Sequence, residues 1–377
     1  MNYQGRSKGW MLRTLRIGVV ATLTCFASSI HPNTPLEPWT WTYRKIIQQN
    51  ELKSCKNNEL LFSKLNVPAF SQLIFSWNAL RPSIGYFSFA VQVRDMRTKR
   101  WGKWHHMIDW GTNAQKSYLS PTDGHSKYVH VRLETEGEKR ADAFRIKIMG
   151  KQGADIALLK LVAVSIADYG QFKPETVDAC IALPSVVVKG VPKMSQFQVD
   201  HPESRRLCSP TSCSMVTGFL RGEYIDPVDF ADNVFDHGLE IFGSWPFNMA
   251  HAFEQCLGNN WFFTARLNGF ADIHKQLMHG IPVAVSIRGA LEGAPKPYED
   301  GHLLVVVGWN AQKKSVICHD PDLANDNGMK SIDFAEKEEI KTLLLQNIRE
   351  RSFCQYIWYL MKDIVKSFLN LILNLTQ

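Results

Sequence analysis

Apolar and polar residues alternate through the first half of the chain. In YFSFAVQVRD (86–95), Phe87, Phe89 and Val91 alternate with small or polar residues, which predicts a strand with one buried face. The same period of two recurs in LIFSWNAL (73–80), KYVHVRLET (127–135), AFRIKIMG (143–150) and LLKLVAVSI (158–166). Turn-forming residues separate these segments, and no helical pattern interrupts them. We therefore expect an all-β sandwich over residues 66–168.

The second half mixes helical and strand patterns. In RRLCSPTSCSMVTGFL (205–220), apolar residues recur at helical spacing after Cys208, which places that thiol at the start of a helix. A second helix is expected in FNMAHAFEQCLG (247–258). Strands are expected in IPVAVSIRG (281–289), HLLVVVGWN (302–310) and SVICHDP (315–321). The pattern predicts an α+β domain over residues 169–350.

The two ends of the chain differ from these domains. A basic lead followed by the apolar run Ile17 to Ala27 is typical of a signal peptide over residues 1–30, which implies export to the periplasm, cell envelope or extracellular space. A lipid anchor on Cys25 and a membrane anchor are the alternatives. Residues 31–65 are interpreted as a linker or lead-in. Residues 351–377 carry apolar residues at helical spacing, which predicts an amphipathic helix that docks on the preceding domain or contacts a membrane surface.

Composition excludes several functional classes. The 377 residues carry a net charge of +7 that is spread along the chain, so we expect no nucleic-acid partner. The eight cysteines lack paired metal-ligand spacing, which argues against a zinc site and a disulfide scaffold but leaves a few disulfides open. The acidic run in residues 320–328 weakly resembles a calcium loop, but Ser331 stands where a glutamate is required. No metal and no cofactor are predicted.

Three tryptophans gather in RWGKWHHMIDWG. They are Trp101, Trp104 and Trp110. Exposed indole rings offer flat apolar faces on which sugar rings stack, whereas buried ones are large core residues. The buried or half-buried interpretation is favoured for at least two of the three.

The spacing of His302 and Asp320 brings an imidazole and a carboxylate together. His302 stands directly before the apolar strand, Asp320 ends the next strand, and residues 310–314 form a polar connector of hairpin length. A chain that turns near residue 311 returns Asp320 to within about two positions of His302, on a strand roughly 5 Å away. With Cys208, this pair supplies the groups of thiol catalysis: a nucleophile, a general base and a residue that orients the base. Taken alone, each of the three is more simply a structural residue.

Five ordered blocks carry a family resemblance. VPKMSQF (191–197), CSPTSCSM (208–215), SWPFNMA (244–250), DGHLLVVVGW (300–309) and HDP (319–321) resemble the signature blocks of the bacteriocin-leader (double-glycine) peptidase-like family, the peptidase C-thirty-nine-like cysteine peptidases. The resemblance implies a papain-like fold for residues 169–350. It also implies that Cys208 is the nucleophile, His302 the general base and Asp320 the orienting acid.

The resemblance further implies that Gln196 stabilises the oxyanion, with Gln198 as a competitor. Ser209 replaces the usual glycine after the nucleophile. Cys213 lies about 140° around the helix from Cys208, so the two thiols cannot face one cleft. The β-sandwich is similar to an accessory domain of some secreted members.

These observations predict a secreted or envelope cysteine peptidase that hydrolyses peptide or amide bonds through a thioester. Its partners would be a peptide or protein substrate, and the sandwich would contact cell wall or carbohydrate. The alternatives are a non-catalytic binding or scaffold protein that uses the sandwich, and an acyl transferase of the same thiol chemistry.

Overall fold

The computed structural model describes residues 38–48, 51–52, 56–172, 183–289, 294, 296–323, 332–333 and 357–362. The signal peptide expected over residues 1–30 lies outside the described residues, and so does most of the segment 351–377. The described part is α+β, as the sequence predicted.

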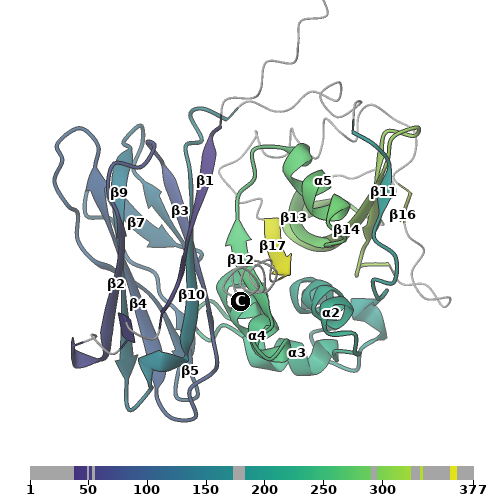
Figure 1. The fold of residues 1–377 in the computed structure, drawn as a ribbon, viewed down its shortest axis with the longest axis horizontal. Helices are drawn as coiled ribbons and strands as arrows, with labels where there is room; N and C mark the ends of the chain where they lie inside the picture. The colour runs from purple at the N-terminus through teal and green to yellow at the C-terminus, as the bar shows by residue number, and fades with distance from the viewer. Residues whose placement is uncertain are drawn as a thin grey trace, which may run out of the picture. The chain divides into compact units, whose positions relative to one another are not determined.

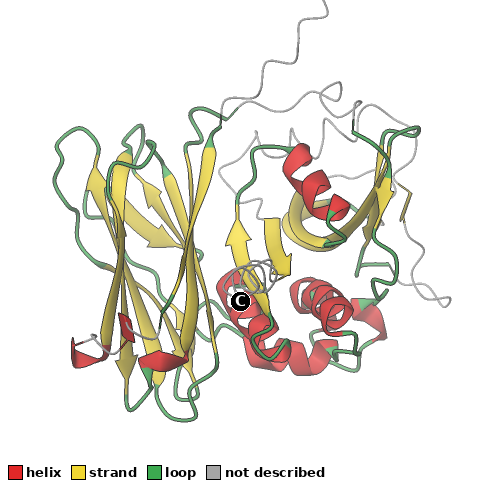
Figure 2. Ribbon diagram, in the orientation of Figure 1, coloured by secondary structure: helices red, strands yellow, loops and turns green. Residues whose placement is uncertain are grey.

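Two five-stranded antiparallel sheets contain the strands of the first half (Figures 1 and 2). The first sheet has the order β1 (Thr40–Ile46), β10 (Leu159–Ala167), β3 (Gln72–Ala79), β8 (Arg132–Thr135) and β7 (Ser126–Val129). The second has the order β2 (Glu59–Lys64), β9 (Ala141–Lys151), β4 (Tyr86–Asp95), β5 (His105–Gly111) and β6 (Gln115–Ser117). Short 3-10 turns, η1 (Lys56–Asn58) and η2 (Ile156–Leu158), precede β2 and β10.

Aromatic side chains from both sheets fill the space between them. Phe75 and Trp77 of β3 meet Phe89 of β4, and the rings of Trp77 and Phe89 stack with centroids 4.4 Å apart. Trp110 of β5 packs edge-on against Trp77 and is fully buried. These inward residues sit at every second position of their strands, as the alternating pattern predicted.

The interpretation of residues 31–65 as a linker or lead-in was wrong for residues 40–46 and 59–64, which are strands of the sandwich. β1 pairs with β10 along its whole length, and β2 pairs likewise with β9. Both are edge strands, so many of their side chains are only half-buried and their sequences lack a clean apolar alternation.

KYVHVRLET does not form the single strand that its alternation predicted. It forms the hairpin of β7 and β8, with His130 and Val131 at the turn, at φ values of 45° and 55°. Left-handed φ at two successive residues is the geometry of a tight hairpin turn, but it is unfavourable for a β-branched residue. Val131 is buried, so packing holds this conformation.

Strand β3 is buried on both faces, not on one as its alternation predicted. Its second face meets the edge of β12 (Asn260–Ala265), a strand from the second half of the chain. The Asn78 side chain bonds both the N–H and the carbonyl of Phe262, and Ser76 accepts from the N–H of Thr264. Side chains of the sandwich thus pair the open backbone edge of β12.

The described residues of the second half form four helices and a seven-stranded sheet. The helices are α2 (Cys208–Arg221), α3 (Pro227–Val234), α4 (Trp245–Gln255) and α5 (Phe270–Met278), with 3-10 turns η4 (Gln196–Gln198) and η5 (Ser204–Arg206) before α2. The sheet has the order β12, β17 (Ile357–Lys362), β13 (Val283–Gly289), β14 (Tyr298–Asn310), β15 (Ser315–His319) and β16 (Ile332–Asp333), and β11 (Val186–Val187) also pairs with β14. No helix among the described residues is both long and apolar enough to cross a membrane.

The prediction of a C-terminal helix over 351–377 was wrong at residues 357–362. This segment is β17, which pairs with β12 and also bridges to β13 (Figure 1). Its sequence IWYLMK combines aromatic and branched residues that suit a strand, and the gap between β12 and β13 offers it backbone partners. Tertiary pairing therefore overrides the helical spacing of its apolar residues.

Replacing Asn78 with alanine tests the pairing between the sandwich and β12. The Asn78→Ala variant leaves the buried N–H and carbonyl of Phe262 without partners, which should lower the free energy of unfolding by about 2–4 kcal/mol. Urea unfolding measures the change. The exposed Asn259→Ala variant is the control and should stay within about 0.5 kcal/mol of the wild type. Equal stability of the two variants would show that the pairing contributes nothing.

Candidate active site

Helix α2 begins at Cys208, as the sequence predicted. Pro210 lies in its first turn, where the missing N–H costs no helical hydrogen bond. The helix runs 14 residues to Arg221 and is capped by Gly222, whose φ of 77° lies in the left-handed region that glycine adopts readily. Cys208 is half-buried, whereas the next ten residues of the helix are buried. The partial positive charge of the helix start favours a thiolate at this position.

The hairpin of β14 and β15 brings His302 and Asp320 together. The strands pair antiparallel with Val305 opposite His319. Asp320, the residue that follows β15, therefore lies near His302 of β14. The Nε2 atom of His302 lies 2.6 Å from Oδ1 of Asp320. This confirms the proximity that the connector length predicted. Because Nε2 is engaged, Nδ1 is the ring nitrogen left to face the thiol.

Asp320 has no exposed surface, and both of its carboxylate oxygens are hydrogen-bonded. Oδ1 also accepts from the backbone N–H of Asp322 at 2.9 Å, and Oδ2 accepts from the hydroxyl of Tyr298 at 2.7 Å. Burial alone would raise the pKa of the Asp320 carboxyl, but the bonds and charge of its partners bring it below the ordinary value. The carboxylate therefore stays ionised next to His302.

Tyr298 is a residue of this site that sequence reasoning missed. Its ring stacks on the His302 imidazole with centroids 4.0 Å apart and an interplanar angle of 12°. Burial and the Asp320 charge raise the pKa of Tyr298 far above its ordinary value, so the hydroxyl remains a donor. The even spacing of Tyr298 and His302 along one strand is the signal that could have suggested a shared face.

Helix α2 contacts the start of β14 at two points. The side chain of Cys208 lies beside His302 and the backbone N–H of Leu303, and both lower the pKa of its thiol. One helical turn on, the hydroxyl of Ser212 donates to the carbonyl of Leu303 at 3.0 Å. These contacts hold the nucleophile helix against the strand that carries the base.

The environment shifts the thiol and the imidazole toward their charged forms. Burial is the largest influence on the pKa of Cys208 and would raise it, but the bond and charge of His302 and the Leu303 N–H lower it below the ordinary value. Burial likewise disfavours imidazolium at His302, but Asp320 and Cys208 raise the pKa of the ring above that of a free histidine. A thiolate–imidazolium pair is therefore favoured near neutral pH.

Gln196 is buried beside the segment that precedes Cys208. Its backbone N–H donates to the carbonyl of Pro321 at 2.9 Å, and its side-chain Nε2 donates to the carbonyl of Arg205 at 3.0 Å. Gln198, the competing candidate, is exposed. The loop that holds Gln196 is thus anchored both to the residue after Asp320 and to the approach to α2.

A series of buried polar contacts connects the sandwich to the first turn of α2. Asp236 accepts from the backbone N–H and the hydroxyl of Ser117 in β6, at 2.9 and 2.5 Å, and from the hydroxyl of Ser244. Asn248 of α4 donates to the carbonyl of Ser244 at 3.0 Å and accepts from the Ser209 hydroxyl at 3.3 Å. Ser209 is the residue after the nucleophile, so sandwich contacts extend to the edge of the site.

Residues 188–343 match the model of the Peptidase_C39 like family. This segment belongs to that family. The match indicates a function related to cysteine peptidases and includes Cys208, His302, Asp320 and Gln196, while the strands of the sandwich lie outside it. No curated protein and no solved structure matches the chain.

Cys213 lies five residues beyond Cys208 on the same helix. It is buried on α2, and burial raises the pKa of its thiol well above the ordinary value. Cys208 and Cys213 are both free thiols, and so are Cys256 and Cys318 among the described residues. Cys208 alone of these four has a lowered pKa.

Alkylation by iodoacetamide tests the state of the Cys208 thiol. Its rate should reach half its maximum at a pH clearly below about 8.5, the pKa of a free cysteine, because thiolate is the reacting form. Peptide mapping of the native protein should find Cys208 labelled well before Cys213. A pH profile like that of a model thiol would contradict the lowered pKa of Cys208.

The Asp320→Asn variant tests the charge that supports His302. Without the carboxylate, the pKa of His302 should fall, imidazolium should form less readily, and the pKa of Cys208 should therefore rise. Direct repulsion between Asp320 and the thiolate acts in the opposite sense but is the smallest influence on Cys208. The alkylation midpoint should move to higher pH. Asp300→Asn, at an exposed position, should leave it in place.

Proposed function

We propose that residues 169–350 form a papain-like cysteine peptidase domain that hydrolyses peptide bonds through a thioester on Cys208. The observation that carries this proposal is the bonded His302–Asp320 pair beside the Cys208 thiol, whose pKa His302 lowers. The packing of a nucleophile helix against antiparallel strands that carry the base and the acid supports the papain-like assignment.

In the first step, the Cys208 thiolate attacks the carbonyl carbon of the substrate. The His302 imidazolium then gives its proton to the leaving amine as the carbon–nitrogen bond breaks, which leaves an acyl group on sulfur. Asp320 keeps the imidazole in one orientation and stabilises its positive charge. In the second step, His302 takes a proton from water, the hydroxyl oxygen attacks the thioester, and the thiol and a carboxylic acid are released.

The developing oxyanion requires hydrogen-bond donors near the sulfur. We assign this role to the backbone N–H of Cys208, at the start of α2, and to the side-chain amide of Gln196. The amide carries two hydrogens, and its bond to the Arg205 carbonyl uses one of them. The buried position of Gln196, in contrast to exposed Gln198, supports the choice between the two glutamines.

We propose further that the protein is exported, as the basic lead and apolar run of residues 1–30 indicate. A thiolate in an oxidising compartment is readily oxidised to sulfenic acid or a mixed disulfide. Assays of activity should therefore contain a reducing agent.

Cleavage of a peptide library tests the proposed reaction. The full chain is incubated with a mixed peptide library under reducing conditions near pH 7, and new termini are identified by mass spectrometry. Wild-type protein should generate reproducible new termini. Cys208→Ala should reduce their formation by at least about 10³-fold, because loss of the nucleophile removes the covalent route.

Cys213→Ala is the matched control, since it removes a buried thiol from the same helix. It should retain cleavage. Cleavage by Cys208→Ala at the wild-type rate, or no new termini from any form of the folded protein, would overturn the proposal.

A further inference from the structure

The outward face of the sheet β2–β9–β4–β5–β6 combines aromatic rings with cations. We call it the aromatic–cationic face, and it consists of Trp101, Trp104, Lys116, Tyr118, Arg145 and Lys147. In β9, Ile146 and Ile148 point into the core, so the alternate residues Arg145 and Lys147 point outward. The face is accessible to solvent, since Leu61, opposite Lys147 on β2, is 48% exposed.

Each ring of this face has a cation over it. The Arg145 guanidinium carbon lies 3.8 Å from the Trp101 ring centroid, and the Lys147 ammonium lies 4.7 Å from that of Trp104. The Lys116 ammonium lies 4.8 Å from the ring of Tyr118. Trp101 and Trp104 are half-buried, whereas Trp110, the third tryptophan of the segment, is a core residue. Two of the three tryptophans thus serve a surface and not the core.

The positive charge of the face is not neutralised by its own carboxylates. Asp109 is bound to His106 at 2.8 Å and to the Tyr118 hydroxyl at 2.6 Å. Within the part of the chain that the structure describes, no carboxylate lies within ion-pair distance of Lys116, Arg145 or Lys147. Their charges are therefore available to an anionic ligand.

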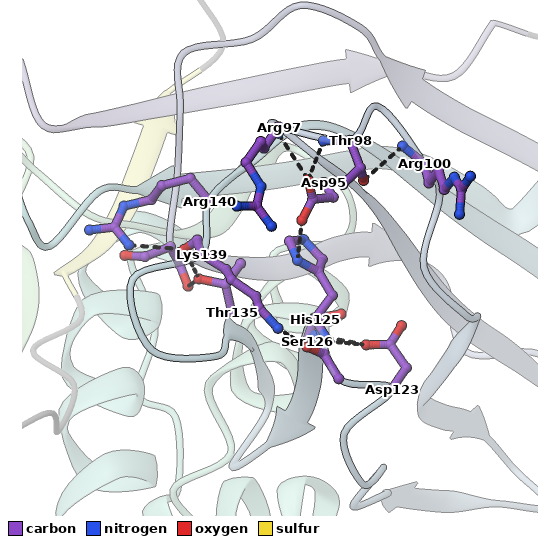
Figure 3. A network of polar contacts seen from close by, with 12 residues as sticks. Asp95, Arg97, Thr98, Arg100, Asp123, His125, Ser126, Thr135, Lys139 and Arg140 are labelled. Atoms are coloured by element: carbon purple, nitrogen blue, oxygen red, sulfur yellow. Dashed lines mark hydrogen bonds and ion pairs between the residues drawn. The ribbon is translucent and has the colours of Figure 1, made fainter.

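The loop that presents the tryptophans is held in place before any ligand binds. The Gln92 side chain donates to the carbonyl of Gly102 at 2.8 Å, and the N–H of Lys103 donates to Asp123 at 2.8 Å. Asp123 also accepts from the backbone of Ser126, and Asp95, at the start of the loop, pairs with His125 at 3.0 Å (Figure 3). These contacts reduce the entropy that a ligand would otherwise have to overcome in ordering the rings.

We propose that the aromatic–cationic face binds an acidic polysaccharide with uronic acid units. A uronic acid presents an apolar C–H face, which packs on an aromatic ring, and a carboxylate, which pairs with a cation. On Trp101 and Trp104 the cation lies over one face of the indole, so a sugar would pack on the rest of the half-buried ring while its carboxylate pairs with that cation. A membrane surface fits less well, because the one strongly exposed large apolar side chain on the described strands of this sheet is Leu61.

Affinity electrophoresis of the full chain tests this proposal. The gels contain polygalacturonate, alginate or hyaluronate, with neutral dextran and poly-L-glutamate as controls. We expect retardation by at least one polyuronate and little by dextran. Poly-L-glutamate carries the same charge without sugar rings, so it should bind on the order of tenfold more weakly.

Two sets of variants separate charge from stacking. Lys147→Gln and Trp104→Ala should each weaken polyuronate binding several-fold, while Lys313→Gln/Lys314→Gln, in the turn between β14 and β15, should not change it. Thermal unfolding checks each variant, and Lys147→Gln tests the face without altering a ring. Retention of peptidase activity by these variants separates this proposal from that for Cys208.

Three outcomes would overturn the proposal. They are an absence of retardation by every polyuronate, equal binding to poly-L-glutamate that survives Trp104→Ala, and tighter binding to phosphatidylglycerol vesicles than to any polyuronate.

Discussion

The buried carboxylate of Asp320 is the interaction on which the candidate site depends. An ionised group with no exposed surface is strongly unfavourable unless donors surround it. His302, Tyr298 and the backbone of Asp322 supply these donors, and the first two lie on β14 while Asp320 follows β15. A shift of the hairpin register would leave the charge unpaired, so the same requirement fixes the register and the orientation of the imidazole.

Contacts on two sides of the first turns of α2 fix the position of the nucleophile. On one side, Ser212 and Cys208 contact the backbone and side chains at residues 302 and 303. On the other, Ser209 is tied through Asn248 to the loop that Asp236 and Ser117 anchor to the sandwich. The sandwich also pairs the open edge of β12 through Asn78. It is therefore part of the structural support of the site, beyond any ligand that it binds.

Sequence reasoning located those parts of the fold that local pattern and spacing determine. The helix start at Cys208 and the meeting of His302 with Asp320 follow from helical periodicity and hairpin length. Parts that depend on distant contacts were misinterpreted. The edge strands β1 and β2 lack a clean alternation, β3 is buried on both faces because α4 and β12 of the second half also pack on it, and β17 becomes a strand between two sheet neighbours. Tyr298 was missed because its even spacing from His302 indicates only a shared face, and its role follows from the bond to Asp320, which is distant in the sequence.

Trapping of an acyl-enzyme tests the central claim most directly. The full chain is mixed with an activated ester of a short peptide, quenched in acid within seconds, and digested for mass spectrometry. The bonded His302–Asp320 pair beside the Cys208 thiol predicts that the acyl group is found on Cys208 and that the adduct is strongly reduced in His302→Ala. Turnover of the ester without an adduct, or an adduct on another residue that persists in Cys208→Ala, would contradict the account.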